Sequence, residues 1–116
     1  KSWDLHVDVA LKINRDENVT MISDSVGYAA GKLNEVIFDA EHFFDGYKSN
    51  SEFAMRCVKA AYDAGARWIV LCDTNGGTLP HEIEEIVAEV CKQVPGKHIG
   101  IHTHDDTGNA VANSLI

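Results

Sequence analysis

One alternation of segments recurs about every thirty residues, and it restricts the fold of the chain more than any other feature. The expected strands are Leu5–Leu11, Glu35–Glu41, Trp68–Thr74 and Lys97–His104. They begin at residues 5, 35, 68 and 97, which are 30, 33 and 29 residues apart. The residues between them space their apolar side chains as on one face of a helix. Strands that alternate with helices form a parallel sheet covered by helices, so we expect an α/β fold of about four βα units.

Local signals mark where the expected helices begin and end. The helices are Asp16–Ala30, Asn50–Ala64, a third from Pro80 to Pro95-Gly96, and a fourth that begins near Asp106 or Thr107. The second helix follows a Ser-x-x-Glu capping box at Ser49. Proline suits the first position of the third, because its missing N–H would be unpaired there in any case. The segment Phe43–Ser49 contains Asp45-Gly46, which is typical of a turn, so we expect a loop.

Composition excludes several classes of partner. The 116 residues include 10 basic and 18 acidic side chains, for a formal net charge of −8. Such a chain repels phosphate, so we expect neither a nucleic acid nor an anionic membrane as partner. It has no apolar run of the roughly 20 residues that span a bilayer and no signal peptide, which favours a soluble, cytoplasmic protein. The three cysteines, Cys57, Cys72 and Cys91, form no C-x-x-C pair, and we interpret each as a small core residue.

Polar residues gather toward the carboxyl end of each expected strand, on the face opposite the apolar one. Parallel α/β folds bind their ligands beyond this end. His102 and His104 lie two residues apart and share a face, with Cα atoms roughly 6.5 Å apart, so both rings can reach one divalent cation. The alternative is that His104 and Asp105 cap the following helix. His98 lies on the same face, where we interpret it as a satisfied or solvent-facing histidine.

Three further candidates are less specific. Glu41 faces the same end of the sheet, where a carboxylate can act as a general acid or base, or be a solvated charge at a strand end. The glycines that follow Thr74 allow a tight turn and close backbone approach to a ligand, although their spacing matches neither a P-loop nor a dinucleotide fingerprint. His6, on the first expected strand, is by itself more typical of a satisfied core polar residue. His42 has the opposite parity, and we interpret it as a structural or loop residue.

With these residues in place, the chain resembles a known family. The run from His102 to Gly108, with the following Ala-Val-Ala-Asn-Ser-Leu, resembles the signature of the synthases that make 2-isopropylmalate, homocitrate and citramalate. These synthases share a (β/α)8 barrel with the 3-hydroxy-3-methylglutaryl-CoA lyases. Asp73-Thr74-x-Gly76 is similar to a strand end of the family, Glu41 to its strand-four glutamate, and His6 to a strand-three histidine. The segment Phe38–Lys48 looks most like the citramalate branch.

The resemblance implies a mechanism and a set of roles. His102 and His104 would hold a divalent metal such as Mn, Mg or Zn, which polarises the carbonyl of a 2-oxo acid such as pyruvate. Acetyl-CoA, the co-substrate, would then attack that carbonyl. His6 and Thr74 would contact the acid, and Glu41 would belong to the acid/base set. Asp105 departs from the family, which usually has asparagine there.

The resemblance also implies that this chain is part of a larger domain. It would supply strands three to six of the barrel, so residues 1–116 would be an internal fragment of a (β/α)8 catalytic domain of about 250 residues. The arginine and the aspartate that the family carries on its first strand are not among these residues. We therefore expect the fragment to be inactive alone and to self-associate through its open edges. A lyase or aldolase of the same barrel, or a non-catalytic module, are the alternatives.

Overall fold

The computed structural model describes all of residues 1–116 and contains a parallel sheet of three strands in the order β1-β2-β3. The strands are β1 (Ile37–Ala40), β2 (Trp68–Asp73) and β3 (Ile99–Thr103). The helices are α1 (Asp4–His6), the π-helical η1 (Val7–Leu11), α2 (Arg15–Ala30), α3 (Phe43–Ser49), α4 (Ser51–Asp63), α5 (Pro80–Cys91), the 3₁₀ turn η2 (Gly96–His98) and α6 (Ala110–Leu115). The protein is therefore an α/β protein, and its small parallel sheet is consistent with part of a (β/α)8 barrel.

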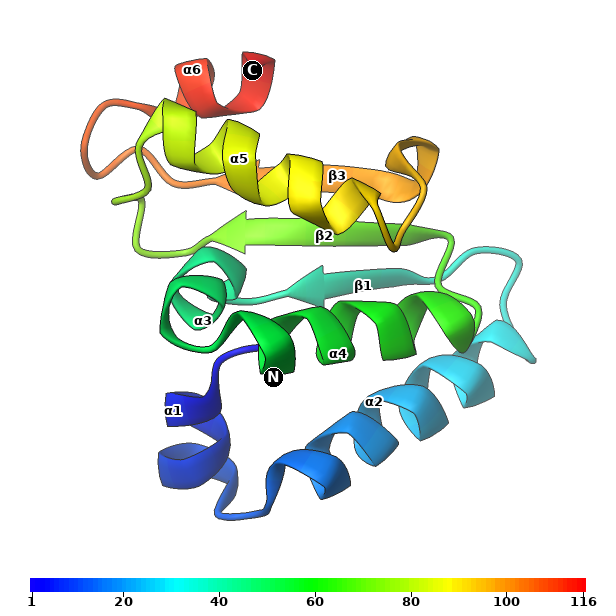
Figure 1. The fold of residues 1–116 in the computed structure, drawn as a ribbon. Helices are drawn as coiled ribbons and strands as arrows, with labels where there is room; N and C mark the ends of the chain where they lie inside the picture. Colours follow the sequence, from blue (N-terminus) through cyan, green and yellow to red (C-terminus); the bar gives the residue numbers. More distant parts are fainter.

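One face of the sheet packs into the core. Ile69 and Leu71 of β2 are fully buried, and they belong to one apolar cluster with Val58 of α4 and Ile83 of α5. Helix α2 packs on α4 at the outer side of the molecule (Figure 1). The opposite face of the sheet carries Asp39, Cys72 and His102 together with Ile37, which is 58% exposed. None of the helices has the length and apolar character that crossing a membrane requires.

The first expected strand is wrong, because Leu5–Leu11 folds as the short helices α1 and η1. Its apolar alternation does not mark a buried face: Val7 is buried, whereas Leu5 and Val9 are 47% and 65% exposed. The backbone instead bonds within the segment, since the N–H of Lys12 donates to the carbonyl of Val7 at 2.8 Å. The sheet consequently has three strands rather than four, and strands three to six of a barrel are not all present.

The loop expected at Phe43–Ser49 is also wrong, because this segment is helix α3. Phe43 and Phe44 are fully buried, and the helix gains this burial by packing against β2 and α4. Gly46 lies inside the helix rather than in a turn, and the space where its side chain would be is taken by the backbone of Ser2 and Trp3. Helix α3 therefore lies beside the arrowheads of the strands, at the end of the sheet where polar residues were expected (Figure 1).

The other expected elements agree in position and differ at their ends. Asn50, rather than Ser49, caps α4, and its side chain accepts the N–H of Phe53 at 3.1 Å. Helix α5 begins at Pro80 as expected, and α6 begins at Ala110, later than expected, because Asp105–Gly108 forms a turn in which the N–H of Gly108 donates to the carbonyl of Asp105. The structure contains no disulfide, and Cys91 is exposed rather than in the core.

Candidate functional site

The polar face of the sheet brings together side chains from all three strands. The register pairs Cys72 of β2 with His102 of β3, and Asp39 of β1 with Val70, which shares a face with Cys72. The faces expected from alternation are therefore confirmed for these strands. Asp39 and His102 are open to solvent, whereas Cys72 is buried between them.

His102 and His104 lie on this face, as expected from their spacing. Their ring centroids are 5.0 Å apart, and both side chains are exposed, so each can turn a nitrogen toward one ion. The cap of α6 does not use His104, because Asp105 Oδ1 accepts the N–H of Ala110 at 2.9 Å. His98 is engaged elsewhere: its Nδ1 lies 2.8 Å from the carbonyl of Arg67. The donor set of two accessible imidazoles fits a divalent cation.

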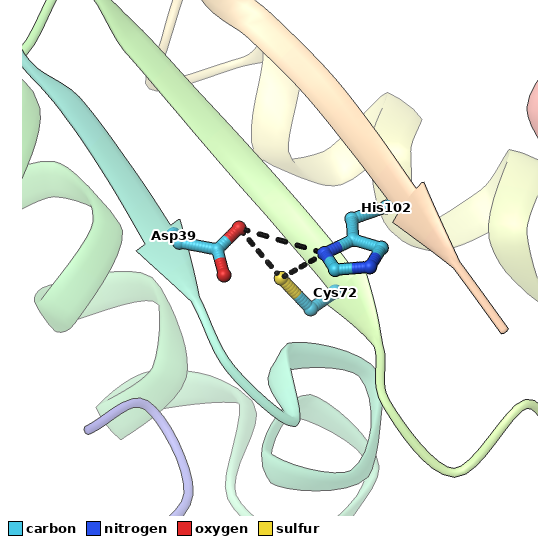
Figure 2. Close-up of side chains that lie close together, drawn as sticks. All are labelled: Asp39, Cys72 and His102. Carbon is cyan, nitrogen blue, oxygen red and sulfur yellow. Dashed lines mark hydrogen bonds and ion pairs between the residues drawn. The ribbon is translucent and has the colours of Figure 1, made fainter.

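Asp39 and Cys72 add two more donor atoms beside His102, as Figure 2 shows. The thiol of Cys72 donates a hydrogen bond of 3.1 Å to Asp39 Oδ1. Nδ1 of His102 lies 3.9 Å from Cys72 Sγ and 3.9 Å from Asp39 Oδ1. Burial raises the pKa of the Cys72 thiol, and its hydrogen bond to Asp39 raises it further. This cluster was not predicted from the sequence, where Cys72 was interpreted as a core residue, because alternation does not reveal which strands are neighbours or in which register.

Glu41 directly follows β1 and forms an ion pair with Lys1. The hydrogen bond that Lys1 donates to Glu41 in this ion pair lowers the pKa of the Glu41 carboxyl, so Glu41 is ionised at neutral pH. Asp39 lies two residues before Glu41, so the carboxylate of Glu41 is at the end of the sheet that carries the three-strand cluster. An ionised carboxylate in this position can accept a proton.

His6 reaches the same end of the sheet from a helix rather than from a strand. Its ring packs edge-on against His42, with centroids 4.7 Å apart, and lies 4.9 Å from Trp3. Burial lowers the pKa of His6, and the neighbouring His42 lowers it further. The strand assignment of His6 is therefore wrong, but the structure still places it with residues that adjoin Glu41.

His42 links these residues to Thr74, a connection that the sequence analysis missed. Its backbone has a left-handed φ of 56°, and its N–H donates to Thr74 Oγ1 at 2.8 Å. Its Nδ1 lies 3.0 Å from Asp45, which also accepts a hydrogen bond from Asn75. Parity led us to interpret His42 as a structural or loop residue, and this parity argument fails here because the regular alternation of a strand does not continue through a left-handed residue.

The turn after β2 is held by a buried carboxylate. Asp73 is only 1% exposed and accepts hydrogen bonds from both the hydroxyl and the N–H of Thr78, at 2.8 and 3.2 Å. Gly76 has a φ of 62°, and a side chain there would meet Asp106 Oδ2 at 2.7 Å. The backbone at Gly76 therefore closely approaches the segment that follows β3. This contact joins the turn after Thr74 to the segment that contains His104 and Asp106.

Residues 2–116 match the sequence model of the HMGL-like family. The chain belongs to the HMGL-like family. It is 58% identical over 116 residues to (R)-citramalate synthase of Aquifex aeolicus, covering all of this chain and 22% of that relative. It is 37% identical to 2-isopropylmalate synthase 1 of Caldanaerobacter subterraneus and 33% identical to homocitrate synthase of Sulfurisphaera tokodaii, covering 97% of this chain and 28% and 24% of those relatives.

These similarities confirm the resemblance stated from the sequence, including its preference for the citramalate branch. The HMGL-like chain spans less than a third of the length of the curated relatives it matches.

Proposed function

We propose that this chain forms part of the active site of a metal-dependent synthase that condenses acetyl-CoA with a 2-oxo acid, for which pyruvate is the best candidate. The observation that carries the proposal is the pair of exposed histidines at the carboxyl end of β3, in a chain 58% identical to a citramalate synthase. The protein that contains it would be a cytoplasmic acyltransferase of amino-acid biosynthesis. The three strands would be strands four to six of its barrel, and residues 1–116 an internal part of its catalytic domain.

Each candidate residue has a role that its surroundings allow. His102 and His104 would hold the divalent metal, which when bound withdraws electron density from the carbonyl of the acid. Glu41, ionised through its pairing with Lys1, would take part in proton transfer. Thr74 Oγ1 accepts the N–H of His42, which leaves its own proton free for a carboxylate oxygen of the acid.

His6 would contact the same acid. Because burial lowers its pKa, its ring is neutral near pH 7 and offers one donor and one acceptor nitrogen. Its packing against His42 would fix the position of the ring relative to Thr74. We also propose that the chain associates, through the free edges of β1 and β3, with another copy or with the remainder of a barrel.

The test is an assay of the protein that contains this chain, with pyruvate and acetyl-CoA as substrates and free CoA as the product measured. We expect His102→Ala and His104→Ala each to abolish both CoA release and Mn²⁺ binding measured by calorimetry. His98→Ala is the matched control and should retain both, because His98 lies against Arg67 and away from the site. Absence of CoA release with every 2-oxo acid tested, or cleavage of an aldol substrate instead, would refute the synthase proposal.

A further inference from the structure

Asp39, Cys72 and His102 place three different donor atoms around one point on the polar face (Figure 2). The separations are 3.1 Å between sulfur and carboxylate oxygen, and 3.9 Å from His102 Nδ1 to each of the other two. Zinc bonds of about 2.3 Å to sulfur and about 2.0–2.2 Å to nitrogen and oxygen put tetrahedral donors about 3.4–3.6 Å apart. The observed distances lie on both sides of this range, so small side-chain rotations suffice to enclose an ion.

We propose that Asp39, Cys72 and His102 form a thiolate-containing site for Zn²⁺ or a similar thiophilic divalent cation. Each residue lies on a different strand, and the hydrogen bonds of the sheet hold the three backbones in a constant register. Asp39 and His102 are 58% and 52% exposed, so an ion can enter from solvent and keep a water molecule as its fourth ligand. As the metal–sulfur bond forms, the S–H bond breaks and its proton passes to solvent.

The sulfur ligand determines which ions this site selects. Thiolates favour Zn²⁺ and other soft or borderline cations, whereas Mg²⁺ and Mn²⁺ prefer oxygen ligands. The site differs from the pair His102 and His104, whose two imidazoles do not discriminate between these ions in this way. Cys72 is therefore the residue that would make this part of the sheet selective.

The two arrangements exclude one another because they share His102, a consequence that rests on the proposed function. A neutral imidazole has one lone pair on its ring nitrogens. If His102 binds an ion through Nδ1, its other nitrogen carries the proton and cannot join His104 in binding a second ion. Zinc at the thiolate site would thus compete with the metal of the condensation reaction and inhibit it.

The experiment titrates the 116-residue chain with Co²⁺, which replaces zinc and reports a sulfur ligand through a near-ultraviolet charge-transfer band. We expect this band in the unaltered chain and its loss when Zn²⁺ is added. Cys72→Ser should abolish the band, whereas Cys91→Ser, which removes an exposed thiol, should leave it unchanged. Asp39→Asn should weaken binding more than about 100-fold, because the loss of outer partners of a metal site already costs about 10–100-fold.

Asp39→Asn also distinguishes loss of metal binding from loss of folding, because Asp39 is exposed and its replacement leaves the core intact. His104→Gln should retain the band, because His104 is not a member of the site. Absence of the band in the unaltered chain, or its persistence in Cys72→Ser, would overturn the inference. Cobalt binding that lacks the band and requires His104 would refute the thiolate site and leave the synthase proposal standing. A normal band in a protein that does not condense acetyl-CoA with a 2-oxo acid would support the thiolate site and refute the synthase proposal.

Discussion

Replacing Gly46 with alanine tests the contact that brings α3 to the functional end of the sheet. A Cβ atom at this position would lie 2.3 Å from the carbonyl oxygen of Ser2 and 2.9 Å from Cα of Trp3. Ordinary contact begins at 3.4 Å, so the two segments would have to separate by about 1 Å. Both neighbours are backbone atoms, which cannot rotate away as a flexible side chain would.

The expected free-energy change follows from two opposing effects. Overpacking of this kind costs about 1–3 kcal/mol, and backbone contacts place Gly46→Ala toward the upper end. Alanine is favoured over glycine inside a helix by about 1 kcal/mol. We therefore expect Gly46→Ala to lower the free energy of unfolding by about 2 kcal/mol. With a urea m-value of about 2 kcal/mol/M, the midpoint of unfolding would fall by about 1 M.

Gly27→Ala in α2 is the matched control, because the added Cβ would make only an ordinary van der Waals contact there. The nearest atom to its Cβ would be the carbonyl oxygen of Ala64, at 3.9 Å. This variant should gain up to about 1 kcal/mol, so the two alanine substitutions are expected to have opposite signs. Urea unfolding followed by circular dichroism measures both.

A second measurement connects Gly46 with the site. If α3 moves away from Trp3, the packing of His6 against His42 loosens, and the pKa of His6 should rise toward its ordinary value. Titration of the His6 ring by NMR would detect this change. A Gly46→Ala variant as stable as the unaltered chain, with an unchanged His6 titration, would refute the close contact on which the reasoning depends.

Two further predictions concern buried and partly buried groups of the site. Asp73→Ala removes both acceptors of Thr78, whose N–H and hydroxyl would remain buried, so we expect a loss of about 3 kcal/mol or more in urea unfolding. An effect below about 1 kcal/mol would contradict the role of Asp73 in holding the turn. The pKa of His6 is lower in the folded chain than its ordinary value of about 6.5 in the unfolded chain. The contribution of neutral His6 to the free energy of unfolding is therefore complete above about pH 6.5 and is lost as the pH falls through the folded pKa. The free energy of unfolding should therefore decrease on acidification below pH 6.5, and His6→Gln should make this decrease smaller. An equally steep decrease in His6→Gln would contradict the assignment of the pH dependence to His6.

The sequence predicted the sheet well where local and tertiary preferences agree. The apolar run Trp68–Cys72 precedes Asp73 and a glycine-rich turn, and it forms most of the central strand. Pro80 begins α5 as its missing N–H suggests, and Asn50 caps α4 next to the serine that was expected to do so. These outcomes depend on neighbours within a few residues, which a sequence displays directly.

The errors occur where distant segments decide the structure. Leu5–Leu11 has the alternation of a strand, but a strand needs an adjacent strand, and none lies beside it. Phe43–Ser49 carries a turn dipeptide, but burial of Phe43 and Phe44 outweighs that local preference and makes it a helix. Local pattern could not predict either result, because each depends on which surface is available for packing.

For this protein the amino-acid sequence alone determined the parallel α/β class, the shared face of His102 and His104, and the likeness to the condensing synthases. The class and the shared face follow from the spacing of residues along single elements, where the backbone geometry is known in advance, whereas the likeness rests on the resemblance of whole motifs such as His102–Gly108. Only the tertiary structure decided that Asp39 and Cys72 adjoin His102 and that His42 joins His6 to Thr74. Those contacts depend on strand register and on a left-handed residue, and packing of the whole chain sets both.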